Sequence, residues 1–227
     1  EQYNANKKYS EAVAVAAEKC EDDTKGQTCF ICTQALHWKT KEGLVRGCAC
    51  RGTAGFAHVS CLAEQAKILV AEAEENNKPK NPAWARWSWC RLCGQRYHGV
   101  VWCALGWACW KTYLGRPESD RTRRSAMTHL GNGLSAARHH EDALSVREAE
   151  LAMLRRLGAS EKNLLAVQGN LANTYQFLGR LDEALQLYRD VYSGRLKLKG
   201  EEDEDTLLSA NNYATAFGRL RRAWSSR

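Results

Sequence analysis

Apolar and polar positions follow a helical period through the second half of the chain. From about residue 116 onward, alanine and leucine recur at spacings of three and four, and beyond residue 120 neither proline nor cysteine occurs. This pattern predicts a series of amphipathic helices over residues 116–227. The stretch Arg116–Asp120, which contains Pro117, reads as the boundary before them.

The first half gives shorter helical signals. Residues 59–75 are rich in alanine, leucine, glutamate and lysine and contain no helix breaker, so they predict one helix. Residues 76–82 hold two prolines and three asparagines and predict a loop. Residues 1–25 predict a polar helical leader; a second interpretation is the last helix of an upstream repeat, because residues 9–15 resemble residues 181–185.

The most apolar run is VVWCALGWACW, residues 100–110, which is too short to cross a bilayer. We therefore expect no membrane span. The surrounding segment, residues 99–113, is expected to pack as a cap on the region that precedes it, with its tryptophans used for packing.

An internal repeat is visible in the helical half. Leu130-Gly131-Asn132 aligns with Leu171-Ala172-Asn173 at an offset of 41 residues, and Asp182-Glu183-Ala184-Leu185 repeats Glu141-Asp142-Ala143-Leu144 at the same offset. A third copy begins at Asn212-Tyr213-Ala214. It stops after its first helix, so we expect that the natural protein continues or that this end is frayed.

The second copy carries the pattern most clearly. Small residues allow two helices to approach closely, and large residues fill the space between them. The pattern resembles tetratricopeptide repeats, and its period resembles that of kinesin light chains. The resemblance implies antiparallel helix pairs with a groove for a protein or peptide ligand. Candidate groove contacts are Asn132, Asn173 and Asn212; the alternative is that they are exposed or capping polar residues. The residues that carry the resemblance are Leu171, Ala172, Tyr175, Gly179, Ala184 and Tyr188.

The ten cysteines are confined to the span from Cys20 to Cys109, which indicates a local metal or disulfide framework. Eight residues form four pairs at ligand spacing, enough for two tetrahedral ions. A pair separated by two residues allows both thiolates to face one ion. Cys20, Cys103 and Cys109 are left over and read as ordinary thiols. The eight candidate ligands are Cys29, Cys32, Cys48, Cys50, His58, Cys61, Cys90 and Cys93.

The order of these ligands resembles the RING-CH variant of the RING family, including the single residue between Cys48 and Cys50 and the seven residues before His58. The resemblance implies two structural Zn²⁺ ions in a cross-brace. One ion would take Cys29, Cys32, His58 and Cys61, and the other would take Cys48, Cys50, Cys90 and Cys93. Two features depart from the family: the gap of 28 residues after Cys61, and Ala66 where membrane-associated relatives carry tryptophan.

Two other interpretations fit part of the pattern. A PHD-like finger has the same ligand order. It usually has more residues between the third and fourth cysteines, here Cys48 and Cys50, and fewer between the fourth cysteine and the histidine. A disulfide framework would need an oxidising compartment, whereas His58 stands at ligand spacing and no secretory signal is visible, although the chain starts with glutamate and is processed or a fragment.

By resemblance, the zinc domain docks a ubiquitin-conjugating enzyme and orients its thioester for attack. Catalysis by orientation requires no catalytic side chain on the ligase, and the sequence offers none. The docking candidates are Ile31, Trp84, Trp87 and Leu92, although either tryptophan could instead pack against the helix over 59–75. Arg96 is a loose candidate for the basic residue that many RING domains place after the last cysteines.

Charge adds little to this picture. The net charge is +7, but the middle of the chain has no dense lysine and arginine stripe, so no nucleic acid is expected. The expected location is intracellular, cytoplasmic or nuclear.

The predicted fold is mainly α. A two-zinc cross-brace RING-CH domain with a tryptophan-rich extension spans residues 26–115. Antiparallel helix-pair tetratricopeptide-type repeats span residues 116–227, with two full copies and a truncated third. The predicted function is a ubiquitin-protein ligase whose repeats recruit a substrate or scaffold. The alternatives are a non-catalytic zinc-binding adaptor and, less favoured, a PHD-like chromatin reader.

Overall fold

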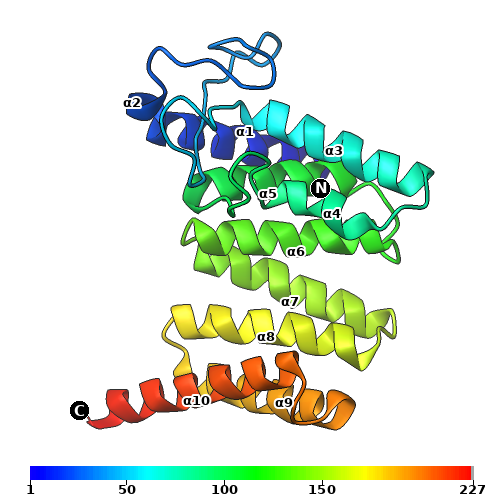
Figure 1. The fold of residues 1–227 in the computed structure, drawn as a ribbon. Coiled ribbons are helices and arrows are strands. Elements are labelled where there is room, and N and C mark those ends of the chain that lie inside the picture. Colours follow the sequence, from blue (N-terminus) through cyan, green and yellow to red (C-terminus); the bar gives the residue numbers. More distant parts are fainter. Residues whose placement is uncertain (226–227) are drawn as a thin grey trace. The chain divides into compact units, whose positions relative to one another are not determined.

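A computed structural model describes residues 1–225 and is almost entirely helical (Figure 1). No named β-strand occurs in this part of the chain; two isolated antiparallel bridges join Val45 to Ala57 and Trp89 to Arg96. The helices are α1 (Gln2–Lys19), α2 (Glu21–Thr24), α3 (Val59–Glu75), α4 (Lys80–Trp84), the 3-10 helix η1 (Ala85–Trp87), α5 (Gly99–Tyr113), α6 (Arg121–Ala136), α7 (His140–Arg156), α8 (Glu161–Phe177), α9 (Leu181–Lys199) and α10 (Glu204–Ser225).

The chain forms two compact units, and each is described by itself. The first unit is Glu1–His139 and the second begins at His140. Helix α6, the first helix of the predicted repeats, belongs to the first unit because it packs along α5.

Helix α5 is the centre of the first unit. Its sequence is apolar on nearly every face, and a helix of that kind is stable only when neighbours surround it. Helices α1, α3 and α6 pack against α5 in the structure. Its buried residues include Leu105 and Cys109, neither of which is exposed at all. The run over residues 99–113 was predicted to cap the region before it, but it lies at the centre of the unit because helices pack on several of its sides.

Helix α1 covers one side of α5. Its sequence is mostly polar, but Ala5, Tyr9, Val13 and Ala16 recur at helical spacing and are buried. The Tyr9 hydroxyl also lies 3.0 Å from Ser60 Oγ on α3. The polar leader predicted for residues 1–25 thus contains a helix that contributes an apolar stripe to the core.

The approach of α5 and α6 is unusually close because each helix has a glycine at the crossing. A Cβ atom on Gly133 would lie 2.7 Å from the Trp102 carbonyl oxygen, and one on Gly106 would lie 3.1 Å from the His129 carbonyl oxygen. Only glycine leaves room for the two backbones at this distance.

Helix α3 spans the residues predicted for it, Val59–Glu75. The loop that follows is shorter than predicted, because α4 begins at Lys80 and includes Pro82. Proline is tolerated in the first turn of a helix, where the backbone N–H has no partner within the helix. The prediction of a loop through residue 82 was therefore wrong at its end.

The second unit contains α7 to α10, and each helix packs on the next along the chain. Leu144, Leu154 and Leu171 form one apolar cluster, and Ala172, Ala184 and Tyr188 belong to a second. Gly179 makes the turn between α8 and α9 at a φ of +76°. The predicted helical fold with repeats after a cysteine-rich region is confirmed. No helix among the described residues is long and apolar enough to cross a membrane.

Candidate metal centre and ligand clefts

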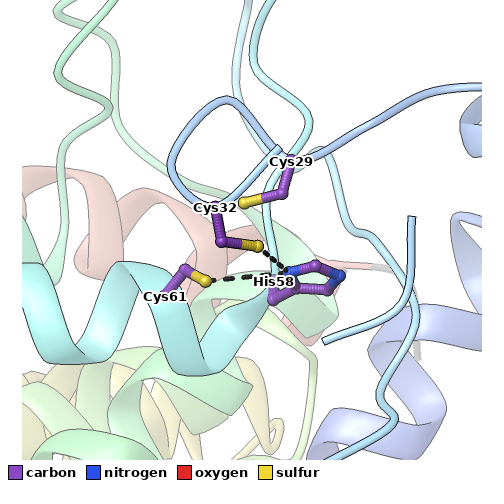
Figure 2. Close-up of side chains that lie close together, drawn as sticks. All are labelled: Cys29, Cys32, His58 and Cys61. Carbon is purple, nitrogen blue, oxygen red and sulfur yellow. Dashed lines mark hydrogen bonds between the residues drawn. The ribbon is translucent and has the colours of Figure 1, made fainter. Parts of the chain in front are cut away.

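Four side chains from two separate segments meet in the first candidate metal site. Cys29 and Cys32 come from a turn near the start of the cysteine-rich region, and His58 and Cys61 come from the beginning of α3. Figure 2 shows these four side chains gathered around the His58 ring. His58 is fully buried, with no exposed surface.

The distances in this site suit a tetrahedral ion. Cys32 Sγ lies 3.3 Å and Cys61 Sγ lies 3.7 Å from His58 Nδ1. Ligands about 2.0–2.3 Å from one zinc ion stand about 3.3–3.8 Å apart at tetrahedral angles. The other ring nitrogen, Nε2, lies 3.2 Å from the Ala35 carbonyl oxygen, which keeps a proton on Nε2 and leaves Nδ1 free to bind a metal.

The second candidate site gathers Cys48, Cys50, Cys90 and Cys93. Cys50 Sγ lies 3.8 Å from Cys90 Sγ, again a tetrahedral separation. Burial raises the pKa of the Cys50 thiol to about 11, which disfavours a free thiolate there. A coordinated divalent cation deprotonates such thiols, so the donor set is suited to a bound cation.

The same turn builds the first cysteine pair of one site and the last pair of the other. The N–H of Thr33 donates to the Cys29 carbonyl, and the N–H of Gly94 donates to the Cys90 carbonyl. Both Thr33 and Gly94 have a positive φ, 62° and 65° respectively. The backbone therefore turns back on itself after each pair, and this turn directs the two sulfurs of the pair to one point.

The remaining cysteines stay outside both groups. Cys20, Cys103 and Cys109 are buried and form no disulfide. Burial also raises the pKa of Cys109 well above its ordinary value. They lie in or beside the core as packing residues.

The predicted docking residues differ in their surroundings. Leu92 is 50% exposed, and Ile31 is half-buried, so both keep a face toward solvent. Trp87, in contrast, is only 1% exposed and forms part of the core with Tyr113. Trp87 cannot touch a partner in this structure, so the prediction that it is a docking residue was wrong. Its burial comes from packing with α3 and α5, which the local sequence does not specify.

Trp84 and Asn132 were predicted for two different sites, yet both line one cleft of the first unit. Trp84 is half-buried and stacks on His129 of α6, with ring centroids 5.4 Å apart. The sequence places Trp84 and Asn132 48 positions apart, so only the packing of α6 against the tryptophan-rich segment unites them.

The other two asparagines lie in the second unit. Asn173 is half-buried and accepts a hydrogen bond of 2.6 Å from the Tyr188 hydroxyl, so it joins α8 to α9. Asn212 is half-buried on α10. Neither borders the 610 Å³ cleft between α7, α8 and α9. Leu171, Tyr175 and Glu148 do border it.

Sequence reasoning did not select several side chains that are exposed in the first unit. Trp38 is 68% exposed and Leu36 is 59% exposed, both between the first cysteine pair and Cys48. An aromatic residue in a polar loop was the only signal available for Trp38.

Comparison with known proteins finds two families along the chain, and the second match begins in α6, which packs with the first unit. The RING-variant domain family matches residues 29–93, and the tetratricopeptide repeat family matches residues 122–197 and 163–227. The chain thus contains a RING-variant domain followed by tetratricopeptide repeats. No curated protein matches the chain.

Two solved structures are similar to the chain, both described as nearly identical tetratricopeptide-like repeats of a putative kinesin light chain from Podosopora anserina. The first is 21% identical, with a TM-score of 0.46, and the match covers 73% of this chain and 71% of that one. The second is a variant of the same repeats and is 19% identical, with a TM-score of 0.46; the match covers 74% of this chain and 82% of that one.

Proposed function

We propose that the chain is a zinc-dependent ubiquitin-protein ligase. In this proposal each of the two four-residue sites holds one structural Zn²⁺ ion. The RING-variant domain docks a ubiquitin-conjugating enzyme, and the tetratricopeptide repeats recruit a protein substrate or scaffold.

The observation that best supports this proposal is the arrangement of the two candidate metal sites. Ligands from residues 29–32 and 58–61 meet in one site, and ligands from 48–50 and 90–93 meet in the other, so the two sets interleave along the chain. This interleaving is the cross-brace that RING-type domains use. Thiolate and imidazole ligands at tetrahedral separations favour zinc over the hard cations, which prefer oxygen ligands. With four protein ligands at each ion no open position remains, so zinc acts on structure alone.

The chain's own contribution to the reaction would be positioning. A conjugating enzyme held at a fixed orientation presents its ubiquitin thioester to an attacking amine, and orientation alone lowers the barrier by several kcal/mol. Ile31 and Leu92 each lie between the two cysteines of a metal-binding pair, so zinc would hold both rigidly. An exposed apolar side chain on a rigid loop is a favourable contact for a partner.

The repeats support the second half of the proposal. Their 610 Å³ cleft has an apolar part that includes Leu171 and Leu187. Its charged residues are three carboxylates and one guanidinium: Glu148, Asp182, Glu183 and Arg155. Such a lining favours a peptide that carries both apolar and basic side chains.

The test is an autoubiquitination assay with purified protein, activating enzyme and a panel of conjugating enzymes. We expect ubiquitin ladders that disappear in Cys48→Ser. Leu92→Ala should lower the rate about tenfold, the loss of roughly 1.4 kcal/mol of docking energy, and Ile31→Ala should act in the same direction. Leu198→Ala is the matched control, because Leu198 is 47% exposed but lies on α9 in the second unit.

The alternative is an adaptor that binds zinc and proteins without ligase activity. Protein shown to hold two zinc ions that gives no ladder with any conjugating enzyme would favour this adaptor. Equal rates for Leu92→Ala, Ile31→Ala and Leu198→Ala would contradict docking through the two zinc loops.

A further inference from the structure

A cleft of about 290 Å³ lies in the first unit beside the second candidate metal site, and none of its lining residues is a candidate ligand. Its wall comes from the α4–η1 segment, the hairpin that precedes α5, α5 and α6. The lining includes three tryptophans, and none of its residues is acidic. The residues are Asn81, Trp84, Ala85, Ser88, Trp89, Arg96, Trp102, His129 and Asn132.

Arg96 provides the single positive charge of this cleft. Its guanidinium carbon lies 4.8 Å from the Trp89 ring centroid and 5.3 Å from the Trp102 ring centroid. Two aromatic faces hold the planar group in place and leave its N–H edge available. Within residues 1–225 Arg96 makes no ion pair, although its side chain is exposed.

The neighbouring polar groups are neutral. His129 stacks on Trp84, and its Nδ1 lies 3.0 Å from Ser88 Oγ. Burial, with a smaller contribution from the positive charge of Arg96, lowers the pKa of His129 to about 4, so the ring carries no charge at neutral pH. Arg96 and His129 are the only titratable side chains among the residues that line the cleft.

A hydrogen-bond donor in the wall has no acceptor. The indole Nε1 of Trp102 is buried, and no partner for it occurs among the described residues. An unsatisfied buried N–H costs about 1–3 kcal/mol. Because Trp102 also lines the cleft, the resonance of this N–H reports on what binds there.

We propose that this cleft binds a carboxylate group of a peptide. One guanidinium with one free edge matches the single charge and the two oxygens of a carboxylate. A phosphate dianion would call for a second cation, and the cleft has none. The volume is just below the range of about 300–1,000 Å³ typical of small-molecule sites, which suits one residue of a peptide. Tryptophan and arginine are also the residues most enriched at energetic centres of protein interfaces.

The carboxylate has two sources in a peptide: the free C-terminus and an aspartate or glutamate side chain. This inference goes beyond the proposed ligase function and does not depend on it, because the cleft belongs to the folded first unit whether or not ubiquitin is transferred.

The test uses the full zinc-loaded chain and the pentapeptide Gly-Ser-Gly-Asp-Leu. Binding is followed by the indole ¹⁵N–¹H resonances, with the Trp102 signal assigned from Trp102→Phe. Three companion peptides carry a C-terminal amide, Asn in place of Asp, or both changes. We expect saturable shifts of the Trp102 signal with the parent peptide and none with the doubly neutral peptide. Whichever single change weakens binding identifies the source of the carboxylate.

Arg96→Gln should weaken peptide binding at least tenfold, while Arg91→Gln should leave it unchanged, because Arg91 is exposed on the neighbouring zinc loop outside the cleft. Both variants should retain two zinc ions and the helical circular dichroism of the parent. Should Arg96→Gln not fold, Trp102→Phe takes its place and should weaken binding measurably, followed then by the indole signals of Trp84 and Trp89, which also line the cleft. Equal binding of the doubly neutral peptide, tighter binding of inorganic phosphate, or no saturable shift at millimolar peptide would overturn the proposal.

Discussion

Gly55 shows how strictly single residues shape the second metal site. It has a φ of +86°, and a Cβ atom there would lie 2.6 Å from Cys50 Cβ and 3.4 Å from Cys48 Sγ. The glycine thus serves two purposes, because it adopts a left-handed backbone conformation and leaves space beside two ligands. Gly52, three residues earlier, has a similar φ of +61° but no atom within 4 Å of its would-be Cβ.

This contrast gives a prediction about metal content. Gly55→Ala should displace Cys50 and lower the zinc content from two ions per chain toward one, measured by a chelating dye after protein denaturation. Gly52→Ala imposes comparable backbone strain without the clash, so it should retain both ions. Equal zinc content in the two variants would show that the clash is absorbed without moving the ligands.

Among the helices of the first unit, the close contact between α5 and α6 depends on two glycines. Gly106 on α5 and Gly133 on α6 each face the backbone of the other helix. Backbone atoms cannot move aside as a flexible side chain can. An added methyl group would therefore push the two helices apart. This close approach also places α6 beside the tryptophan-rich segment and so completes the carboxylate-binding cleft.

We expect Gly133→Ala to lower the free energy of unfolding by about 1–3 kcal/mol, the usual cost of overpacking. Denaturant titration followed by circular dichroism measures this change. Gly115→Ala is the matched control, because Gly115 lies in the turn between α5 and α6 with nothing within 4 Å of the added atom. An unchanged midpoint for Gly133→Ala would mean that α6 shifts along α5 at no cost.

At the scale of the whole molecule, metal dependence should be confined to one unit. Both sites lie within residues 29–93, inside the first unit, whereas the second unit consists of four packed helices without a metal-ligand group among its described residues. Seven of the eight tryptophans also lie in the first unit. The intrinsic fluorescence of the chain therefore reports mainly on the unit that would hold zinc.

Chelation should separate the two units in one experiment. With excess EDTA, we expect tryptophan emission to shift to the red as buried residues such as Trp87 meet water, because structural zinc contributes folding free energy directly. Far-UV circular dichroism should lose the signal of the first unit only, and much of the helical signal should remain. A complete loss of helicity would show that the repeats depend on the metal as well.

Local patterns determined a large part of this protein. The spacing of the cysteine pairs and His58 predicted the residues of two candidate metal sites, and the structure brings them together, because a pair within one turn directs both ligands to one point. The helix over 59–75 was predicted at its observed bounds, since alanine, leucine and glutamate leave few other conformations favourable. The helical repeats were readable because their packing residues recur at a fixed interval.

Only the tertiary structure decided which side chains are buried and which distant residues meet. Trp84, Trp87 and Trp89 are close in sequence, yet one is half-buried, one is in the core and one is 37% exposed. Asn132 and Trp84 line the same cleft although they are far apart in sequence, and the apolar stripe on α1 packs on α5. The physical reason is the distance along the chain over which each effect acts. Ligand spacing and helix propensity act over a few residues, whereas burial depends on surfaces that come together only when the helices pack.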